Sequence, residues 1–271
     1  LALSQGRQGA GIGGVVAPHH QHQVERLLKE LNHGILPFLG RGADRVEGAE
    51  VVIHRRRAVG GDQRLPDLGG DRLFSQVGLA TQAMLYEIGA TTVLPPGYLC
   101  CGYPQTSAGE EDKGQKITTD NRVLFHRVAN TLNYLDIKTV IVSCGTCMDQ
   151  LQKYQFEKIF PGCRLLDIHE YLLEKGVKLD GVTGTRFMYH EPCHAPMKTQ
   201  AGIKVANALM GQPVELSDRC CGESGTLAVT RPDVSTQVRF RKQEEIERGA
   251  GRLRADGFAG QVKLLTSCPS C

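Results

Sequence analysis

The stretch KTVIVSCGTC (residues 138–147) runs from a block of β-branched residues directly into a C-x-x-C pair. Threonine, valine and isoleucine favour strands, and a short apolar run of this kind is typical of a fully buried parallel strand. The chain finishes on a similar stretch, QVKLLTSCPSC (261–271), and both strand patterns end in Ser-Cys. We therefore predict two buried strands, each with a cysteine pair at its carboxyl end.

Two adjacent cysteines and a glycine precede each of these stretches. YLCCGYPQ (98–105) lies upstream of the first, and DRCCGESG (218–225) lies upstream of the second. The second cysteine of the doublet lies 43 positions before the C-x-x-C in the first half and 47 positions before it in the second. In both halves the order is strand, doublet, helix, strand and C-x-x-C, which indicates an internal repeat.

Helical and strand patterns alternate from about residue 72 to the end of the chain. Helices are predicted at 72–89, 116–135, 169–176, 203–211 and 234–253, and strands at 90–95, 138–143, 163–168, 185–190, 213–217 and 261–267. Strands separated by helices favour parallel pairing with helical crossovers. We predict an α/β fold of two pseudo-repeated, Rossmann-like βα units, with cysteine ligands at the carboxyl ends of parallel strands.

The first seventy residues differ in composition from the remainder. They are rich in glycine, arginine and histidine, contain five of the nine histidines, and show one helical pattern, at 23–34. We expect a poorly ordered or non-homologous segment at 1–70, a first repeat at 71–180 and a second repeat at 181–271. The chain starts on leucine and ends on a candidate ligand, which suggests a fragment.

The bulk composition excludes several classes of protein. Apolar residues make up 41% of the chain and charged residues 23%, which is ordinary for a globular protein. A net charge of +3 is too small to predict nucleic-acid binding, and HRRR (54–57) is interpreted as a solvated patch. There is no apolar run of transmembrane length and no secretory leader pattern, so we expect a cytoplasmic protein.

All ten cysteines lie after residue 99, and three kinds of chemistry could explain their pattern. Zinc favours four tetrahedral ligands, and adjacent cysteines reach one ion only with strain. An iron–sulfur cluster is wider than one ion and accepts both thiolates of a doublet, while the following glycine lets the backbone come close. A C-x-x-C redox pair is the third alternative, although it leaves the doublets unexplained.

The second half resembles a known family. Cys193, Cys220-Cys221-Gly222 and Cys268-x-x-Cys271 follow the pattern of the CCG cysteine-rich domain. That repeat is shared by heterodisulfide reductase, the iron–sulfur subunit of glycolate oxidase and lactate-utilisation iron–sulfur proteins. YHEPCH (189–194) and CCGESGTLAV (220–229) also resemble the iron–sulfur module fused to FAD-linked oxidases, and the resemblance extends from about residue 70 to the end.

The resemblance implies [4Fe-4S]-type clusters, held in some family members by five thiolates. The implied ligands of the second repeat are Cys193, Cys220, Cys221, Cys268 and Cys271, and those of the first are Cys100, Cys101, Cys144 and Cys147. The first repeat has no leading cysteine, and the matching place falls near Leu68 or Gly69. One cluster is therefore expected in the second repeat, and a second cluster in the first repeat would have four thiolates.

Other residues beside the ligands are candidates for supporting roles. His190 and His194 flank Cys193 and could ligate iron, tune the potential of a cluster through a hydrogen bond to sulfur, or simply be satisfied at a strand end. Gly102 and Gly222 follow the doublets. The remaining candidates are interpreted as structural: Glu191 and Glu223 as local caps, and Cys163 as a buried strand cysteine.

The functional prediction is an electron-transfer module or subunit of an oxidoreductase, without a flavin or NAD site of its own. By resemblance, electrons would come from an FAD-linked dehydrogenase of a 2-hydroxy acid, such as glycolate or lactate, and pass to a quinone or disulfide acceptor. No nucleic-acid partner is expected, and any membrane association would be peripheral and through a partner. The alternatives are a heterodisulfide-reductase-like disulfide reductase and a zinc-stabilised interaction module.

Overall fold

The computed structural model describes residues 49–53, 75–95, 100–179, 181–223, 227–269 and 271, with side chains from residue 77 onward. The predicted helix at 23–34 and the HRRR group therefore lie outside the described residues.

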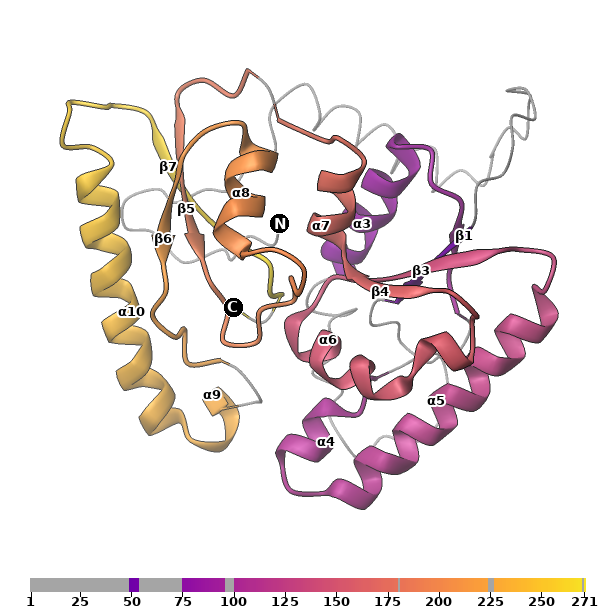
Figure 1. Cartoon of the computed structure of the whole chain (residues 1–271). Coiled ribbons are helices and arrows are strands. Elements are labelled where there is room, and N and C mark those ends of the chain that lie inside the picture. The colour runs from indigo at the N-terminus through magenta and orange to yellow at the C-terminus, as the bar shows by residue number, and fades with distance from the viewer. Residues whose placement is uncertain (1–48, 54–74, 96–99, 180, 224–226, 270) are drawn as a thin grey trace.

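Two sheets of parallel strands organise the chain (Figure 1). The first sheet has the strand order β2-β1-β3-β4, and the second has the order β6-β5-β7. The strands are β1 (Ala49–Ile53), β2 (Thr92–Val93), β3 (Ile137–Val142), β4 (Arg164–Asp167), β5 (Thr185–His190), β6 (Val214–Ser217) and β7 (Gln261–Thr266). Each pairing between them is parallel, which confirms the predicted α/β class. The likeness of each unit to a Rossmann unit stays a prediction.

Helices connect the strands in both halves. They are α3 (Ser75–Glu87), α4 (Tyr103–Ser107), α5 (Glu111–Thr131), α6 (Gly145–Leu151), α7 (Ile168–Glu174), α8 (Gly202–Met210), α9 (Leu227–Thr230) and α10 (Pro232–Arg252), with 3-10 turns at Gln152–Tyr154 and Phe156–Lys158. Local sequence explains several ends: Pro232 opens α10, with Asp233 in its first turn, and Gly211 ends α8 with a φ of 64°. Within the described residues, every helix is too short or too polar to cross a lipid bilayer.

The strand register shows that the two halves are built alike. Strand β1 lies between β2 and β3, and β5 lies between β6 and β7; Ile53 pairs with Val142 as His190 pairs with Thr266. Cys144 lies two residues after Val142, and Cys268 lies two residues after Thr266, so each C-x-x-C begins at the same distance from the paired residues. Strand β1 therefore occupies in the first sheet the position of β5 in the second.

Strand β1 belongs to the sheet of the first repeat, although it lies within the segment 1–70 that was set apart on composition. Cys193 follows His190 by three residues, and three residues beyond Ile53 the sequence has Arg56. The predicted place of the leading cysteine near Leu68 or Gly69 lies, like Arg56, outside the described part of the chain and stays a prediction.

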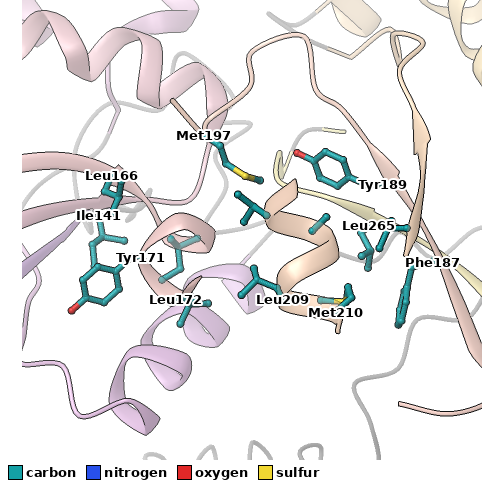
Figure 2. Packing of buried hydrophobic residues seen from close by; sticks show 14 of the residues in the cluster. Ile141, Leu166, Tyr171, Leu172, Phe187, Tyr189, Met197, Leu209, Met210 and Leu265 are labelled. Carbon is teal, nitrogen blue, oxygen red and sulfur yellow. The ribbon is translucent and has the colours of Figure 1, made fainter. Parts of the chain in front are cut away.

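The halves pack against each other through a shared apolar core (Figure 2). Ile141, Leu166 and Leu172 of the first half face Leu209 and Met210 of the second half in one cluster of buried side chains. Helices α7 and α8 lie against each other in this region. Truncation of a buried leucine of this kind costs roughly 2–5 kcal/mol, so the contact is a substantial part of the stability of the chain.

Candidate metal centre

Each C-x-x-C pair lies where a strand ends. Cys144 comes two residues after β3 and has extended backbone angles (φ −149°, ψ 127°), while Cys147 lies in the first turn of α6. Cys268 lies two residues after the end of β7, and its carbonyl oxygen accepts a hydrogen bond from the backbone N–H of Cys271 at 3.2 Å. The strands thus place both pairs at the carboxyl edges of their sheets, as the sequence predicts.

The two doublets share one backbone geometry. The glycines that follow them, Gly102 and Gly222, have φ of 89° and 84°, in the region that favours glycine. Their N–H groups donate to the Sγ of Cys100 (3.4 Å) and of Cys220 (3.3 Å), the first thiol of each doublet. This turn directs the two neighbouring thiols to different partners.

Close packing against a helix is a second reason for glycine at these positions. A Cβ on Gly102 would lie 3.0 Å from the carbonyl oxygen of Gly114 in α5, and one on Gly222 would lie 3.0 Å from that of Ser235 in α10. The hydroxyls of Thr106 and Ser235 also donate to the two glycine carbonyl oxygens, at 3.1 and 2.9 Å. The same construction therefore recurs in both repeats.

The second repeat gathers its predicted ligands in one place. The Sγ atoms of Cys193 and Cys220 are 3.4 Å apart, and ligand atoms of His190, Cys221 and Cys271 all lie within 4.8 Å of one another. A hydrogen bond from Cys271 lowers the pKa of Cys221 to about 4, against the effect of burial. The pKa of Cys271 is raised because its thiol contacts Cys221 and Cys268.

The first repeat brings together the second cysteine of its doublet and its C-x-x-C. A hydrogen bond from Cys147 lowers the pKa of Cys144 to about 6, against the effect of burial. Contacts with Cys101 and Cys144, together with burial, raise the pKa of Cys147 well above its usual value. Tyr154 and Asn121 hold the doublet from behind: the Tyr154 hydroxyl donates to the carbonyl oxygen of Cys101 at 3.0 Å, and the Asn121 amide donates to that of Cys100 at 2.7 Å.

His194 lies between the repeats, in the loop after Cys193. Its Nε2 is 2.8 Å from the Tyr103 hydroxyl, and its Nδ1 is 2.5 Å from a carboxylate oxygen of Asp149. Lys198 donates to the other oxygen of Asp149 at 2.7 Å, and these two partners lower the pKa of this carboxyl despite its burial. Both ring nitrogens of His194 are therefore engaged with first-repeat side chains.

Tight contacts hold that loop against the first repeat. A Cβ on Gly145 would lie 1.6 Å from the carbonyl oxygen of His194, so only glycine fits there. Glu170 of α7, which is buried, accepts hydrogen bonds from the backbone N–H groups of Thr199 (2.8 Å) and Gln200 (2.9 Å) and from the Thr199 hydroxyl. Sequence analysis missed these contacts because Gly145, Asp149 and Glu170 have no signal apart from their tertiary neighbours.

The remaining candidates have plainer surroundings. Burial raises the pKa of Glu191, and burial together with Cys221 raises that of Glu223. Cys163 packs beside the core of the first half, where burial and Glu157 raise its pKa to about 11.

The donor set is rich in sulfur. Each site offers at least four cysteines, all ten cysteines are thiols, and thiolates are soft ligands that select iron–sulfur clusters, zinc or copper(I). In the second site, His190 Nε2 is buried and has no hydrogen-bond partner among the described residues, as expected of an atom that ligates a metal. The residues therefore fit a thiolate-bound metal group.

Two thiol clusters of the same construction define a duplicated, cysteine-rich α/β protein of the metal-binding class. A family model described as the CCG cysteine-rich domain matches residues 68–152 and again residues 187–271. The chain therefore belongs to the CCG cysteine-rich domain family and contains two copies of the domain. The resemblance drawn from the motifs is confirmed.

Curated relatives share this pattern over part of their length. One of them, a component of the fumarate reductase (CoM/CoB) of Methanothermobacter marburgensis, is 27% identical over 98% of this chain and 49% of its own length. An uncharacterized iron–sulfur protein of Methanocaldococcus jannaschii is 26% identical over 78% of this chain and 38% of its own length. Lactate utilization protein A of an Exiguobacterium species is 25% identical, with coverages of 65% and 76%. The chain spans half or less of the two methanogen relatives, and no solved structure is significantly similar.

Proposed function

We propose that this chain is an iron–sulfur electron-transfer module of an oxidoreductase. The observation that carries the proposal is the gathering of Cys193 with Cys220, and of Cys221 with Cys271, at the carboxyl edge of the second sheet. Relatives that are named iron–sulfur proteins support the same cofactor class.

The ligands of the second repeat are Cys193, Cys220, Cys221, Cys268 and Cys271, and those of the first repeat are Cys100, Cys101, Cys144 and Cys147. A bound [4Fe-4S]-type cluster supplies one-electron redox chemistry. The N–H groups of Gly102 and Gly222 donate to ligand sulfurs, which stabilises negative charge there and favours the reduced form. Burial of Cys101 and Cys268 keeps water away from one side of each site.

Substrate chemistry belongs to a separate flavin-linked subunit or domain. Several relatives are named for lactate utilization, which favours a 2-hydroxy acid as the source of electrons; the family resemblance implies an FAD-linked dehydrogenase as the donor and a quinone as the acceptor. This chain would then relay electrons one at a time between that dehydrogenase and the acceptor.

Reduction of a disulfide is a second candidate function. The exposed Cys193–Cys220 pair, with sulfurs 3.4 Å apart, gives a thiol pair access to solvent, and one relative is named for CoM and CoB. Stopped-flow reoxidation of the reduced protein separates the two candidates. Faster reoxidation by a disulfide than by a quinone analogue favours the second one.

The decisive test of the cofactor is anaerobic reconstitution, followed by measurement of the iron, sulfide and zinc bound per protein chain. We expect a brown protein with matched iron and sulfide and an electron paramagnetic resonance signal after reduction. Cys221→Ser should lose most of the iron of the second site, while the control Cys163→Ser should keep all of it. A colourless protein with stoichiometric zinc, or equal iron in the two variants, would contradict the proposal.

A further inference from the structure

His190 ends strand β5 and is buried, with 2% of its surface exposed. Its Nδ1 lies 3.3 Å from the carbonyl oxygen of Ser217, at the end of the neighbouring strand β6. A carbonyl oxygen only accepts hydrogen bonds, so Nδ1 is the nitrogen that carries the proton of the neutral ring. The lone pair is consequently on Nε2.

The surroundings of Ser217 fix the ring in this orientation. The buried Lys242 ammonium donates to the Ser217 carbonyl oxygen at 3.0 Å and to its hydroxyl at 2.6 Å, and it also contacts Glu245 at 2.8 Å. The N–H of Glu191 donates to the same carbonyl oxygen at 3.1 Å. This carbonyl is therefore held in place by three donors, and rotation of the His190 ring would break one of these bonds.

Nε2 is buried and has no hydrogen-bond partner among the described residues. The imidazole also offers a ring nitrogen to the group of donor atoms from His190, Cys221 and Cys271 that lie within 4.8 Å of one another. A buried ring nitrogen without a hydrogen-bond partner is costly, and a cation bound between it and the two sulfurs removes that cost. A ligating histidine characteristically donates its other ring N–H to a backbone carbonyl or carboxylate, as Nδ1 does here.

The matching position in the described part of the first repeat is occupied by isoleucine. Ile53 in β1 corresponds to His190 in β5. Ile53 pairs with Val142, His190 pairs with Thr266, and each of these partners lies two residues before its C-x-x-C pair.

We propose that His190 Nε2 is a ligand to iron at the second site, together with the thiolates of Cys221 and Cys271. The inference rests on the proposed function, since it requires iron at this site. Histidine ligation gives iron–sulfur centres a higher potential than ligation by thiolates alone, so loss of this ligand should lower the potential of the second site.

The test is hyperfine spectroscopy of reconstituted, reduced protein labelled with ¹⁵N in histidine only. We expect a strongly coupled ¹⁵N nucleus in the wild type, its loss in His190→Asn, and its retention in His194→Asn. Asparagine is chosen because its side-chain amide can replace the Nδ1–H donor while lacking any counterpart of Nε2. Both variants replace a histidine by asparagine. They differ only in whether the ring of His190 or that of His194 is removed.

A redox titration gives a second readout that does not depend on that spectrum. The midpoint potential of the second site should fall in His190→Asn and stay unchanged in His194→Asn. Iron-loaded wild type without a coupled ¹⁵N, or a coupling that survives His190→Asn, would overturn the inference while leaving the proposed function intact. Wild type that takes up no iron and sulfide would instead overturn the proposed function.

Discussion

Gly145→Ala should destabilise the protein because the two repeats meet at this residue. The added Cβ would lie 1.6 Å from the carbonyl oxygen of His194 and 2.8 Å from its carbonyl carbon. The loop must retreat by about 2 Å to reach ordinary van der Waals separation. It cannot do so freely, because Asp149 and Tyr103 hold the His194 ring and Glu170 holds the loop further along. Overpacking of this kind costs about 3 kcal/mol.

The assay is anaerobic urea unfolding of reconstituted protein, with Gly251→Ala as the matched control. Gly251 also lies in a helix, near the end of α10, and an added Cβ there has no neighbouring atom within 4 Å. Alanine has a higher helix propensity than glycine, so the stability of this control should be unchanged or up to about 1 kcal/mol higher. Gly145→Ala should also bind less iron at the second site, since Cys193 moves with His194. Equal stability of the two variants would refute the placement of this loop against α6.

Three further predictions concern the site and its supports. Gly222→Ala should lose more stability and more iron than Gly257→Ala. Both glycines have φ near 80°, but only Gly222 packs closely against a helix; unfolding curves and iron analysis test this. Glu170→Ala should cost about 2 kcal/mol because it removes the buried carboxylate that accepts from the N–H groups of Thr199 and Gln200, and Glu170→Gln should cost less; similar losses would contradict the assigned hydrogen bonds. Mild oxidation of metal-free protein should link Cys221 to Cys271 first, because the pKa of Cys221 is lowered to about 4 and its thiolate lies within 4.8 Å of the Cys271 sulfur; peptide mapping that finds another pair first would contradict this.

Local pattern was sufficient for most elements of the α/β fold. Strand β5 was predicted at 185–190 and forms at Thr185–His190, because its apolar residues and β propensity agree with its buried position. Strand β1 was missed because it is a short run inside a glycine- and arginine-rich segment and is fixed by pairing with β2 and β3. Helices α4 and α9 are too short to show a helical period.

The candidate site divides in the same way. Glycine after each doublet was expected to bring the backbone close, and the positive φ of Gly102 and Gly222 has that consequence. The environments of the two histidines beside Cys193 could not be separated from sequence. His190 is in a strand and His194 in a loop, and only tertiary packing directs one ring to the thiols and the other to Tyr103.

The contact between Gly145 and His194 has a consequence for electron transfer. Gly145 lies directly after Cys144, a proposed ligand of the first site, and His194 lies directly after Cys193, a proposed ligand of the second. Because the carbonyl of His194 packs against Gly145, the two sets of ligands are joined by one nonbonded contact through two neighbouring residues. The hydrogen bond between His194 and Tyr103, which follows the first doublet, makes a second connection. The shared core of α7 and α8 keeps both connections in place, and we therefore propose that the duplicated domain acts as one two-centre relay, a property that neither repeat would have alone.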